Sequence, residues 1–373
     1  MMKIAVIGAG LSGSTLSRKL AEEGKEVTIY ERANFIGGQC GDFRVTDDML
    51  IHYYFKSLFG PHIFHTNSEL VWQFVTSFTD MNNYVHKVRT FTGNKLIRWP
   101  INLDTIEHFF GKAEDDDLIG IVKREIREAK SKYGFAKNFE EKVLTFVGET
   151  LYNNLIKNYT TKKWNKEPKN LSEELCKRII INFDRDDRFF RDKYQGLPSD
   201  GYAKMFNNIL SHKNIRVILN YTINKNNIQE LLDNYHIVIS TADINDFYDE
   251  EQLPYQKMVY EERDRIIKIK HDEAIINIPE DESEYFRETD YKKMWRNEEG
   301  DKLIYEKSDD ENGVKLYPIP LEDNIRLSQK LVKDLRLKGI HSIGRLGGYK
   351  YINMDRAILD AINYAKFICT NSY

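Results

Sequence analysis

Three glycines near the N-terminus have the spacing of a dinucleotide-binding turn. They are Gly8, Gly10 and Gly13, and Leu11 and Ser12 stand between the last two. In a Gly-x-Gly-x-x-Gly turn the first glycine allows a tight bend and the second lets the backbone approach a pyrophosphate. The third lets the following helix pack closely on the preceding strand. The phosphates would lie over the helix N-terminus, where unpaired N–H groups favour anions.

An acidic residue and a second glycine pair follow this turn. Glu31 stands about 20 positions on, where a carboxylate can accept hydrogen bonds from an adenosine ribose. Arg32 is next, and Gly38 and Gln39 come shortly after. The second glycine pair would let the backbone run close to the middle of an extended cofactor, which favours FAD. The simpler interpretations are an ordinary glycine-bearing turn and a loop that uses two glycines to bend.

A βαβ unit would position these residues. Residues 3–7 form a continuous β-branched apolar run typical of a strand covered on both faces, and 14–23 have helical periodicity. Residues 26–30 complete the unit as a second strand. Far along the chain, residues 339–345 indicate another strand, and an apolar stripe after Asn353 indicates a helix. Since these can complete the same sheet, the sequence predicts a discontinuous nucleotide-binding domain.

The rest of the chain predicts a helical segment and a second sheet. Helical spacing occurs over 67–80 and 104–160, apolar strands are expected at 215–223 and 236–240, and short β-prone runs alternate with polar turns over 256–320. The prediction is an α/β fold: a discontinuous Rossmann-type FAD-binding domain with a helical insertion and an antiparallel β-sheet domain. Predicted boundaries are 1–85, 195–245 and 326–373 for the FAD-binding domain, 100–175 for the helical substrate domain and 250–325 for the sheet domain.

Composition excludes several classes of protein. The 373 residues carry 55 Lys and Arg against 58 Asp and Glu, so the strongly basic surface of a general nucleic-acid binder is not expected. Hydrophobic residues make up 41% of the chain, which excludes a disordered protein. Three widely spaced cysteines offer neither a disulfide framework nor a cysteine-based zinc site, so no metal is expected. No run approaches the roughly 20 apolar residues of a membrane span, and we expect a cytoplasmic protein.

Five separated segments resemble the UDP-galactopyranose mutases, flavoenzymes that interconvert pyranose and furanose forms of a sugar nucleotide. Gly-Pro-His-Ile-Phe-His-Thr at 60–66 is similar to the family's histidine loop, and residues 99–105 to its Pro-x-Asn segment. Residues 151–164 resemble its uridine-site helix, 192–205 the stretch after its mobile loop, and 344–351 its C-terminal signature. The resemblance therefore covers most of the chain.

The resemblance implies an FAD enzyme that is active when the flavin is reduced. In the implied reaction, flavin N5 attacks the anomeric carbon and displaces the nucleotide diphosphate, so covalent catalysis divides a hard rearrangement into easier steps. The sugar opens, closes through O4 instead of O5, and regains the diphosphate. It also implies a homodimer, an unidentified cellular reductant, and furanose made for surface polysaccharide such as O-antigen or capsule.

Site residues are carried over from the matching motifs. The implied catalytic residues are His62, Arg287, Tyr305, Arg345 and Tyr351. The implied substrate-binding residues are Asn102, Tyr159, Trp164, Tyr194 and Arg185. The implied cofactor-binding residues are Gly8, Gly10, Leu11, Ser12, Gly13, Glu31, Arg32, Gly38, Gln39, His62, Ile63, Thr222, Ile223, Arg345, Asn353, Met354, Asp355, Ala357 and Ile358, with Asn353 expected to cap the last helix.

Several of these residues have simpler interpretations. Tyr159 and Trp164 have the spacing of core aromatic residues, Arg287 lies in a charged stretch typical of a solvated surface, and His62 has the alternative of a structural histidine. Two other classes of protein also stay open: an FAD-dependent amine or polyene oxidase, and a flavin-binding scaffold without activity.

Departures from the family pattern lie at substrate-facing positions. Asn182 stands where the mobile loop normally carries an arginine, and Arg185 or Arg188 would have to replace it. Residues 304–306 read Ile-Tyr-Glu in place of Glu-Tyr-Pro, and 317–320 read Tyr-Pro-Ile-Pro in place of Tyr-Pro-x-Asn. UDP-galactopyranose is the first expectation, and the departures make dTDP-fucopyranose or UDP-N-acetylgalactosamine the alternative.

Overall fold

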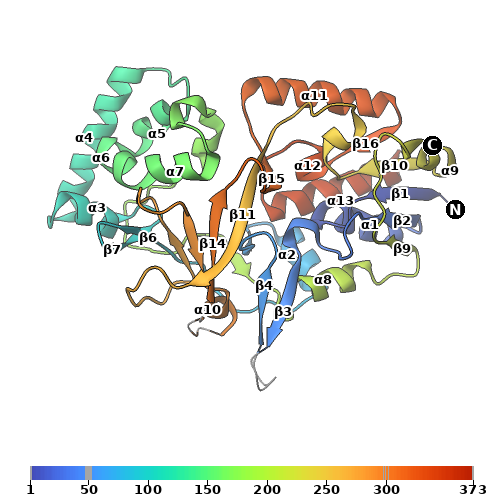
Figure 1. The fold of residues 1–373 in the computed structure, drawn as a ribbon, viewed down its shortest axis with the longest axis horizontal. Helices are drawn as coiled ribbons and strands as arrows, with labels where there is room; N and C mark the ends of the chain where they lie inside the picture. The colour runs from blue at the N-terminus through green and yellow to red at the C-terminus, as the bar shows by residue number, and fades with distance from the viewer. Residues whose placement is uncertain (1, 47–52, 297, 299, 301, 372–373) are drawn as a thin grey trace. The chain divides into compact units, whose positions relative to one another are not determined.

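The chain folds into two compact units, each assembled from separate stretches of sequence. The structure is a computed structural model that describes residues 2–46, 53–296, 298, 300 and 302–371 (Figure 1). Unit 1 comprises 1–84, 192–255 and 316–373, and unit 2 comprises 85–191 and 256–315. The helical and sheet domains expected separately at 100–175 and 250–325 therefore form one unit, and the return to unit 1 comes at 316, not 326.

Unit 1 is built on a five-stranded parallel sheet. The strand order is β16-β10-β1-β2-β9. Its strands are β1 (Lys3–Ile7), β2 (Glu26–Tyr30), β9 (Ile215–Ile218), β10 (Ile237–Ser240) and β16 (Ile340–Ser342). The βαβ start and the late return of the chain to the same sheet are confirmed. The strand expected over 215–223 ends at Ile218.

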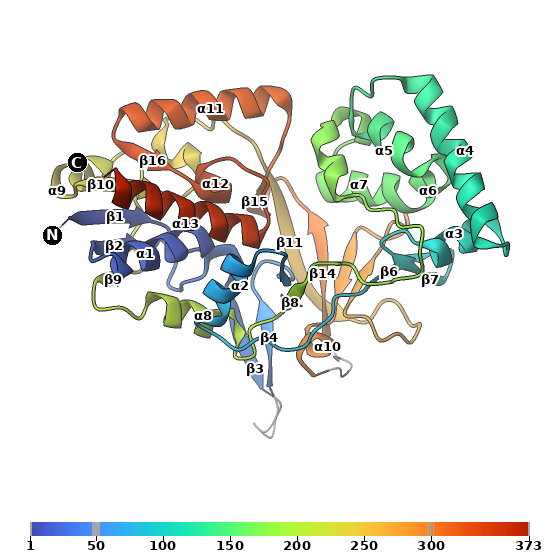
Figure 2. The same cartoon turned by 180° about the vertical axis from the view of Figure 1, so that it is seen from behind.

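Helices with one apolar stripe cover this sheet. In α13 (Met354–Thr370) the stripe includes Ile358, Ala361 and Ile362, all buried, and α13 runs alongside α1 (Leu11–Glu22) (Figure 2). The other elements of unit 1 are η1 (Gly38–Cys40), β3 (Asp42–Thr46), β4 (Tyr53–Ser57), β5 (Phe64–Thr66), α2 (Glu69–Thr76), β8 (Tyr194–Gly196), α8 (Gly201–Leu210), α9 (Ile228–Asn234), η5 (Ile244–Phe247), α11 (Glu322–Leu337) and α12 (Gly344–Gly347).

Unit 2 contains a seven-stranded sheet and a group of helices. The strand order is β15-β11-β14-β13-β12-β6-β7, and the pairing of β12 with β6 is parallel where an antiparallel sheet was expected. The strands are β6 (Val88–Thr92), β7 (Lys95–Trp99), β11 (Tyr255–Asp264), β12 (Ile275–Asn277), β13 (Arg287–Thr289), β14 (Lys302–Ser308) and β15 (Val314–Pro318). The helices are α3 (Leu103–Phe110), α4 (Asp115–Tyr133), α5 (Phe139–Val147), α6 (Glu149–Leu151), η2 (Tyr152–Ile156), α7 (Lys157–Trp164), η3 (Pro168–Asn170), η4 (Glu173–Arg178) and α10 (Tyr291–Arg296).

The first glycine turn offers a test of the fold. A Cβ atom at Gly13 would overlap the carbonyl oxygen of Gly8, which is backbone and cannot swing aside. Gly13→Ala should therefore lower the free energy of unfolding by about 3 kcal/mol, the upper part of the usual cost of overpacking. Urea unfolding followed by circular dichroism measures this.

Gly120→Ala is the matched control. Gly120 lies inside α4 with no heavy atom within 4 Å of the position of an added Cβ. Since alanine is the better helix former, this variant should gain up to about 1 kcal/mol. Equal stability of the two variants would contradict the close backbone contact.

Candidate functional site

Two glycine loops of unit 1 pack backbone against backbone. Gly37 donates its N–H to the carbonyl of Ala9 at 2.9 Å, and a Cβ at Gly38 would lie 2.9 Å from the Cα of Gly10. Gly10 itself has no atom nearer than 3.7 Å to the position of a Cβ. The two loops thus approach each other through glycines that carry no side chain, as a long ligand that lies close to the backbone requires.

Two helix N-termini belong to this part of unit 1. Helix α1 begins after Gly10 with no side-chain cap, so the N–H groups of Leu11 and Ser12 are offered by the backbone alone. Helix α13 begins at Met354, whose Sδ lies 3.5 Å from the Sγ of Cys40 in η1. Asn353 holds the N-cap position, but its side chain makes no capping hydrogen bond, which corrects that expectation.

The residues expected to bind the adenosine part of the cofactor also lie close together. Both Glu31 carboxylate oxygens accept backbone N–H groups, from Ala9 at 2.7 Å and Ala33 at 2.9 Å. Each oxygen keeps a further lone pair for a ribose hydroxyl. Tyr221 donates its N–H to the Glu31 carbonyl, which brings the chain around exposed Thr222 and buried Ile223 to the same end of β2.

Arg345 is held by neutral acceptors. Its Nη1 donates to Gln39 Oε1 at 2.9 Å, and its Nη2 donates to the carbonyl of Ile352 at 2.6 Å. The guanidinium also lies 5.5 Å from the centre of the Tyr317 ring, which meets Tyr351 edge-on at 5.4 Å. No carboxylate forms an ion pair with Arg345 in the described part of the chain, so its charge is available to an anionic ligand.

Tyr317 was missed from the sequence. Its motif had drawn attention only because the asparagine that should follow was absent. The signal that could have found it is the tyrosine that this motif keeps. In the folded chain, the segments around 39, 317 and 345–351 lie together in unit 1.

His62 is neutral in this environment. Its Nδ1 lies 2.9 Å from the carbonyl of Gly60, so this nitrogen carries the proton and Nε2 is left as an acceptor. Burial, followed by the nearby charge of Arg345, lowers the pKa of His62 to about 4. Ile63 beside it is buried, and Tyr202 donates its hydroxyl to the His62 carbonyl at 2.7 Å.

A second arginine cluster lies within unit 2. Arg287 Nη2 donates to the Tyr159 hydroxyl at 2.6 Å, and Arg287 Nη1 lies 3.6 Å from the carboxylate of Glu306. Arg287 and Glu306 are cross-strand partners on β13 and β14, so their side chains share one face of the sheet. Burial raises the pKa of Glu306, which is 3% exposed, while Arg287 acts in the opposite direction. Glu306 was not among the expected site residues.

Tyr305 takes part in a different network in this structure, and its expected contact with a diphosphate stays a prediction. The side chain is completely buried, and its hydroxyl donates to Glu288 and accepts from the N–H of Ile266. Successive residues of a strand point to opposite faces, so Tyr305 lies on the face away from Arg287. In the Ile-Tyr-Glu sequence at 304–306, the carboxylate of Glu306 lies on the same face of the sheet as Arg287, and the phenol of Tyr305 does not.

Asn102 and Trp164 are structural in the described conformation. Asn102 is fully buried, and its side chain caps α3 by accepting from the N–H of Thr105 at 3.0 Å. Trp164 is 5% exposed at the end of α7. Neither offers the surface that was expected for a nucleotide or sugar.

The arginines expected to replace the one missing at Asn182 are neutralised. Arg185 binds Asp104, Glu107 and Asp115, the last at 2.7 Å. Arg188 makes a forked pair with Asp186. The hydrogen bonds from the Arg188 guanidinium lower the pKa of Asp186 to about 2. Both guanidiniums are engaged by carboxylates in this structure, and the assignment of Arg185 to the substrate stays a prediction.

Tyr194 belongs to unit 1. Its ring stacks on Trp72 with centres 4.7 Å apart and planes 8° apart, and its hydroxyl donates to Glu69. Arg32 is exposed and lies 3.9 Å from Asp246, while Ile358 is fully buried and can approach a cofactor only through its backbone.

No group of three His, Cys, Asp or Glu side chains suited to a metal occurs among the described residues. Over the same residues, no helix is both long and apolar enough to cross a bilayer.

The glycine cradle over a parallel sheet defines a Rossmann-type dinucleotide-binding protein, and residues 6–78 match the NAD(P)-binding Rossmann-like domain model. Residues 154–351 match the model of UDP-galactopyranose mutase, and the chain belongs to this family.

Individual relatives agree with that placement. A Klebsiella pneumoniae protein named "Probable UDP-galactopyranose mutase" is 33% identical over 97% of this chain and 93% of its own length. The dTDP-fucopyranose mutase of Escherichia coli is 32% identical over the full length of both chains. A zeta-carotene desaturase of Solanum lycopersicum is 50% identical over only 42 residues. A crystal structure of reduced UDP-galactopyranose mutase shares the fold, with a TM-score of 0.71, 16% identity, and coverage of 99% of this chain and 96% of its own. The chain is thus an isomerase of the mutase type.

Tyr159 and Tyr305, on opposite faces of the unit 2 sheet, should respond differently to loss of a hydroxyl. Tyr305→Phe leaves the buried Glu288 short of a donor and should cost about 1–3 kcal/mol of unfolding free energy, with kcat/KM for a nucleotide sugar within about twofold of wild type. Tyr159→Phe removes the phenol bound by Arg287 and should lower kcat/KM with little loss of stability. Chemical unfolding and steady-state kinetics on both variants measure this. A large loss of kcat/KM in Tyr305→Phe at unchanged stability would return Tyr305 to the substrate site.

The lowered pKa of His62 predicts a pH dependence of stability. The folded protein keeps His62 neutral down to about pH 4, whereas the unfolded chain protonates it near its ordinary value of 6.5. The unfolded state therefore binds more protons in this window, and stability falls as pH drops from about 6.5 to 4. In His62→Gln the free energy of unfolding should fall less over the same range. His341, whose pKa is also about 4, is present in the wild type and in His62→Gln and contributes equally to both. If the free energies of unfolding of the two proteins fell in parallel with pH, the environment assigned to His62 would be contradicted.

Proposed function

We propose that this chain is a flavin-dependent mutase that interconverts UDP-galactopyranose and UDP-galactofuranose. The observation that carries the proposal is Arg345, a cation held by Gln39 and a backbone carbonyl beside two tyrosines and neutral His62. Such a cation can meet the diphosphate of a sugar nucleotide without first breaking an ion pair.

The cofactor in this proposal is FAD. The backbone cradle at Gly10 and Gly38 would be filled by any Cβ atom, and the uncapped N-termini of α1 and α13 supply N–H donors for phosphates and ring oxygens. These features fit a long dinucleotide better than a small ligand. When bound and reduced, FAD would supply a nucleophilic ring nitrogen, N5, for the anomeric carbon as the bond to the diphosphate breaks, with no net redox change.

The chain's own residues have binding and orienting roles. Arg345 would hold the diphosphate as its negative charge grows, with Tyr317 and Tyr351 as neutral walls and hydroxyl partners. In unit 2, Arg287 and Tyr159 form the other group suited to a diphosphate, and Glu306 keeps the guanidinium of Arg287 in place. His62, with its proton fixed on Nδ1, would present a neutral Nε2 acceptor.

A second substrate, dTDP-fucopyranose, is favoured by a specific observation. The dTDP-fucopyranose mutase matches this chain end to end, at an identity within one point of the UDP-galactopyranose relative. In addition, Arg185 and Arg188 are neutralised, so neither replaces the arginine absent at Asn182. Uracil and thymine differ by one methyl group, and galactose and fucose by one hydroxyl, so a few contacts decide between them. A cytoplasmic homodimer, a cellular reductant and a role in surface polysaccharide remain expectations.

Redox state is the decisive test. The purified protein should be yellow, and dithionite-reduced enzyme should convert UDP-galactofuranose to UDP-galactopyranose while oxidised enzyme does not. Borohydride quenching of the reduced reaction should give a flavin that carries a hexosyl group, detected by mass spectrometry. Chromatography of the nucleotide sugars, run in parallel with dTDP-fucofuranose, measures conversion and ranks the two substrates.

The outcomes separate the open classes. Equal rates with oxidised and reduced enzyme would contradict nucleophilic flavin chemistry. Flavin reduction by an amine or an apolar substrate would favour an oxidase. A yellow protein that converts no UDP- or dTDP-sugar in either redox state would favour a scaffold.

A further inference from the structure

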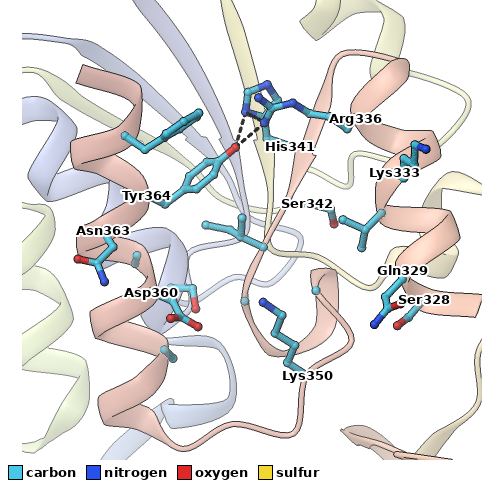
Figure 3. A pocket seen from close by; sticks show the side chains of 18 residues that line it. Ser328, Gln329, Lys333, Arg336, His341, Ser342, Lys350, Asp360, Asn363 and Tyr364 are labelled. Atoms are coloured by element: carbon cyan, nitrogen blue, oxygen red, sulfur yellow. Dashed lines mark hydrogen bonds between the residues drawn. The ribbon is translucent and has the colours of Figure 1, made fainter. Parts of the chain in front are cut away.

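A groove that borders the first glycine turn at Ser12 lies between α11 and α13 in unit 1. Its volume is about 660 Å³, and the carboxyl end of β16 and the chain around Lys350 close its floor (Figure 3). Strand β16 is the edge of the sheet opposite β9, which leads to Thr222 and Ile223. The groove is therefore not the expected adenosine end of the flavin, although Ser12 and Ala357 also line it.

Most of the charged residues that line the groove are positive. Lys333, Arg336 and Lys350 line the groove, and none of them forms an ion pair with a carboxylate in the described ranges. The single acidic lining residue, Asp360, is paired with Arg356 at 2.8 Å. By contrast, Arg326 and Lys338 on the outer part of α11 are each paired with an acidic residue one turn away. Positive charge is thus concentrated in the groove of a chain whose net charge is −3.

Arg336 is fixed in place by neutral partners. Its Nη1 donates to the Tyr364 hydroxyl at 2.7 Å and lies 2.8 Å from His341 Nδ1, and Tyr364 in turn lies 2.6 Å from the same nitrogen (Figure 3). Burial, with the charge of Arg336, lowers the pKa of His341 to about 4, so the imidazole is neutral and accepts. The guanidinium keeps its full charge and its remaining N–H groups for a ligand.

The groove also has a flat apolar wall. Phe367 is 47% exposed and stacks on Tyr364 with ring planes 27° apart, and the side chains of Val332 and Ile343 lie in the same lining. Figure 3 shows Lys350 extending upward between the two helices. An exposed aromatic surface beside several cations suits a ligand with a planar ring and more than one negative charge.

We propose that this groove is a second nucleotide site, which takes a nucleoside diphosphate with its phosphates on the cations of the groove and its base on Phe367. A simple carboxylate would leave two of the three cations unmatched, and an inorganic anion would leave the aromatic wall and most of the volume unused. The proposal concerns binding only and does not depend on the mutase reaction.

The test measures ADP binding to the FAD-loaded full-length protein by isothermal titration calorimetry at physiological salt. Flavin absorbance is followed to confirm that FAD stays bound. The wild-type protein should bind one ADP per chain. The double variant Arg336→Gln, Lys350→Gln should bind ADP at least tenfold more weakly, because each substitution removes a charge-assisted hydrogen bond.

The matched control is Arg326→Gln with Lys338→Gln, which removes the same charge from the ion-paired part of α11 and should bind ADP like wild type. Inorganic pyrophosphate should bind at least tenfold more weakly than ADP, because it cannot use the aromatic wall. Unchanged ADP affinity in the groove variant would overturn the proposal, as would ADP binding that only displaces flavin. Pyrophosphate binding as tight as that of ADP would show an anion site without nucleotide recognition and would also overturn it.

Discussion

Close contact between glycine backbones is the constraint on which the rest of unit 1 depends. Gly13 packs on the carbonyl of Gly8, Gly38 on the Cα of Gly10, and Gly347 within 2.9 Å of the Ser240 carbonyl when a Cβ is added. The last contact holds segments more than one hundred residues apart in sequence at the carboxyl ends of neighbouring parallel strands. A side chain at any of these points would separate the loops and close the stretch of bare backbone that a dinucleotide requires.

The arginines of this chain divide by the kind of partner that holds them. Arg188 and Arg191 are bound by carboxylates of their own loop, and Arg185 is bound by carboxylates of α3 and α4, so all three form ion pairs within the protein. Arg345 and Arg336 are held by amide, carbonyl, phenol or imidazole groups, which fix the guanidinium without neutralising it. Since an anion gains most from a cation that is already oriented and still charged, the second group marks where ligands are expected.

The pleat of the unit 2 sheet separates two sets of polar residues. Arg287 and Glu306 form one cross-strand pair, and Glu288 and Tyr305 form the next, which points to the other face. The second pair joins Arg265 and Asp290 in a buried network, with Arg265 Nη2 3.0 Å from Asp290. On one face, buried charged groups pair with each other and stabilise the fold. On the other face lie Arg287 and its partner, the Tyr159 phenol. Because side chains alternate between the faces, the same strands carry both sets.

The sequence by itself determined the features that depend on local spacing. The βαβ start, the parallel strands that return late in the chain, and the apolar stripe of α13 follow from hydrophobic period and glycine position, and each could be predicted. Motif resemblance likewise brought Gln39 and Arg345 into the expected cofactor-binding set, and their side chains are hydrogen-bonded to each other.

Only the tertiary structure decided which polar side chains remain available. Asn102 and Tyr305 stand in the expected motifs, yet the first caps a helix and the second lies under the sheet. The same holds for Arg185, which is neutralised by residues from two other helices, and for Tyr317, which becomes important through Arg345. Residue type and spacing do not reveal strand register or the ion pairs that long-range packing creates, and these are what set the charge and exposure of each candidate.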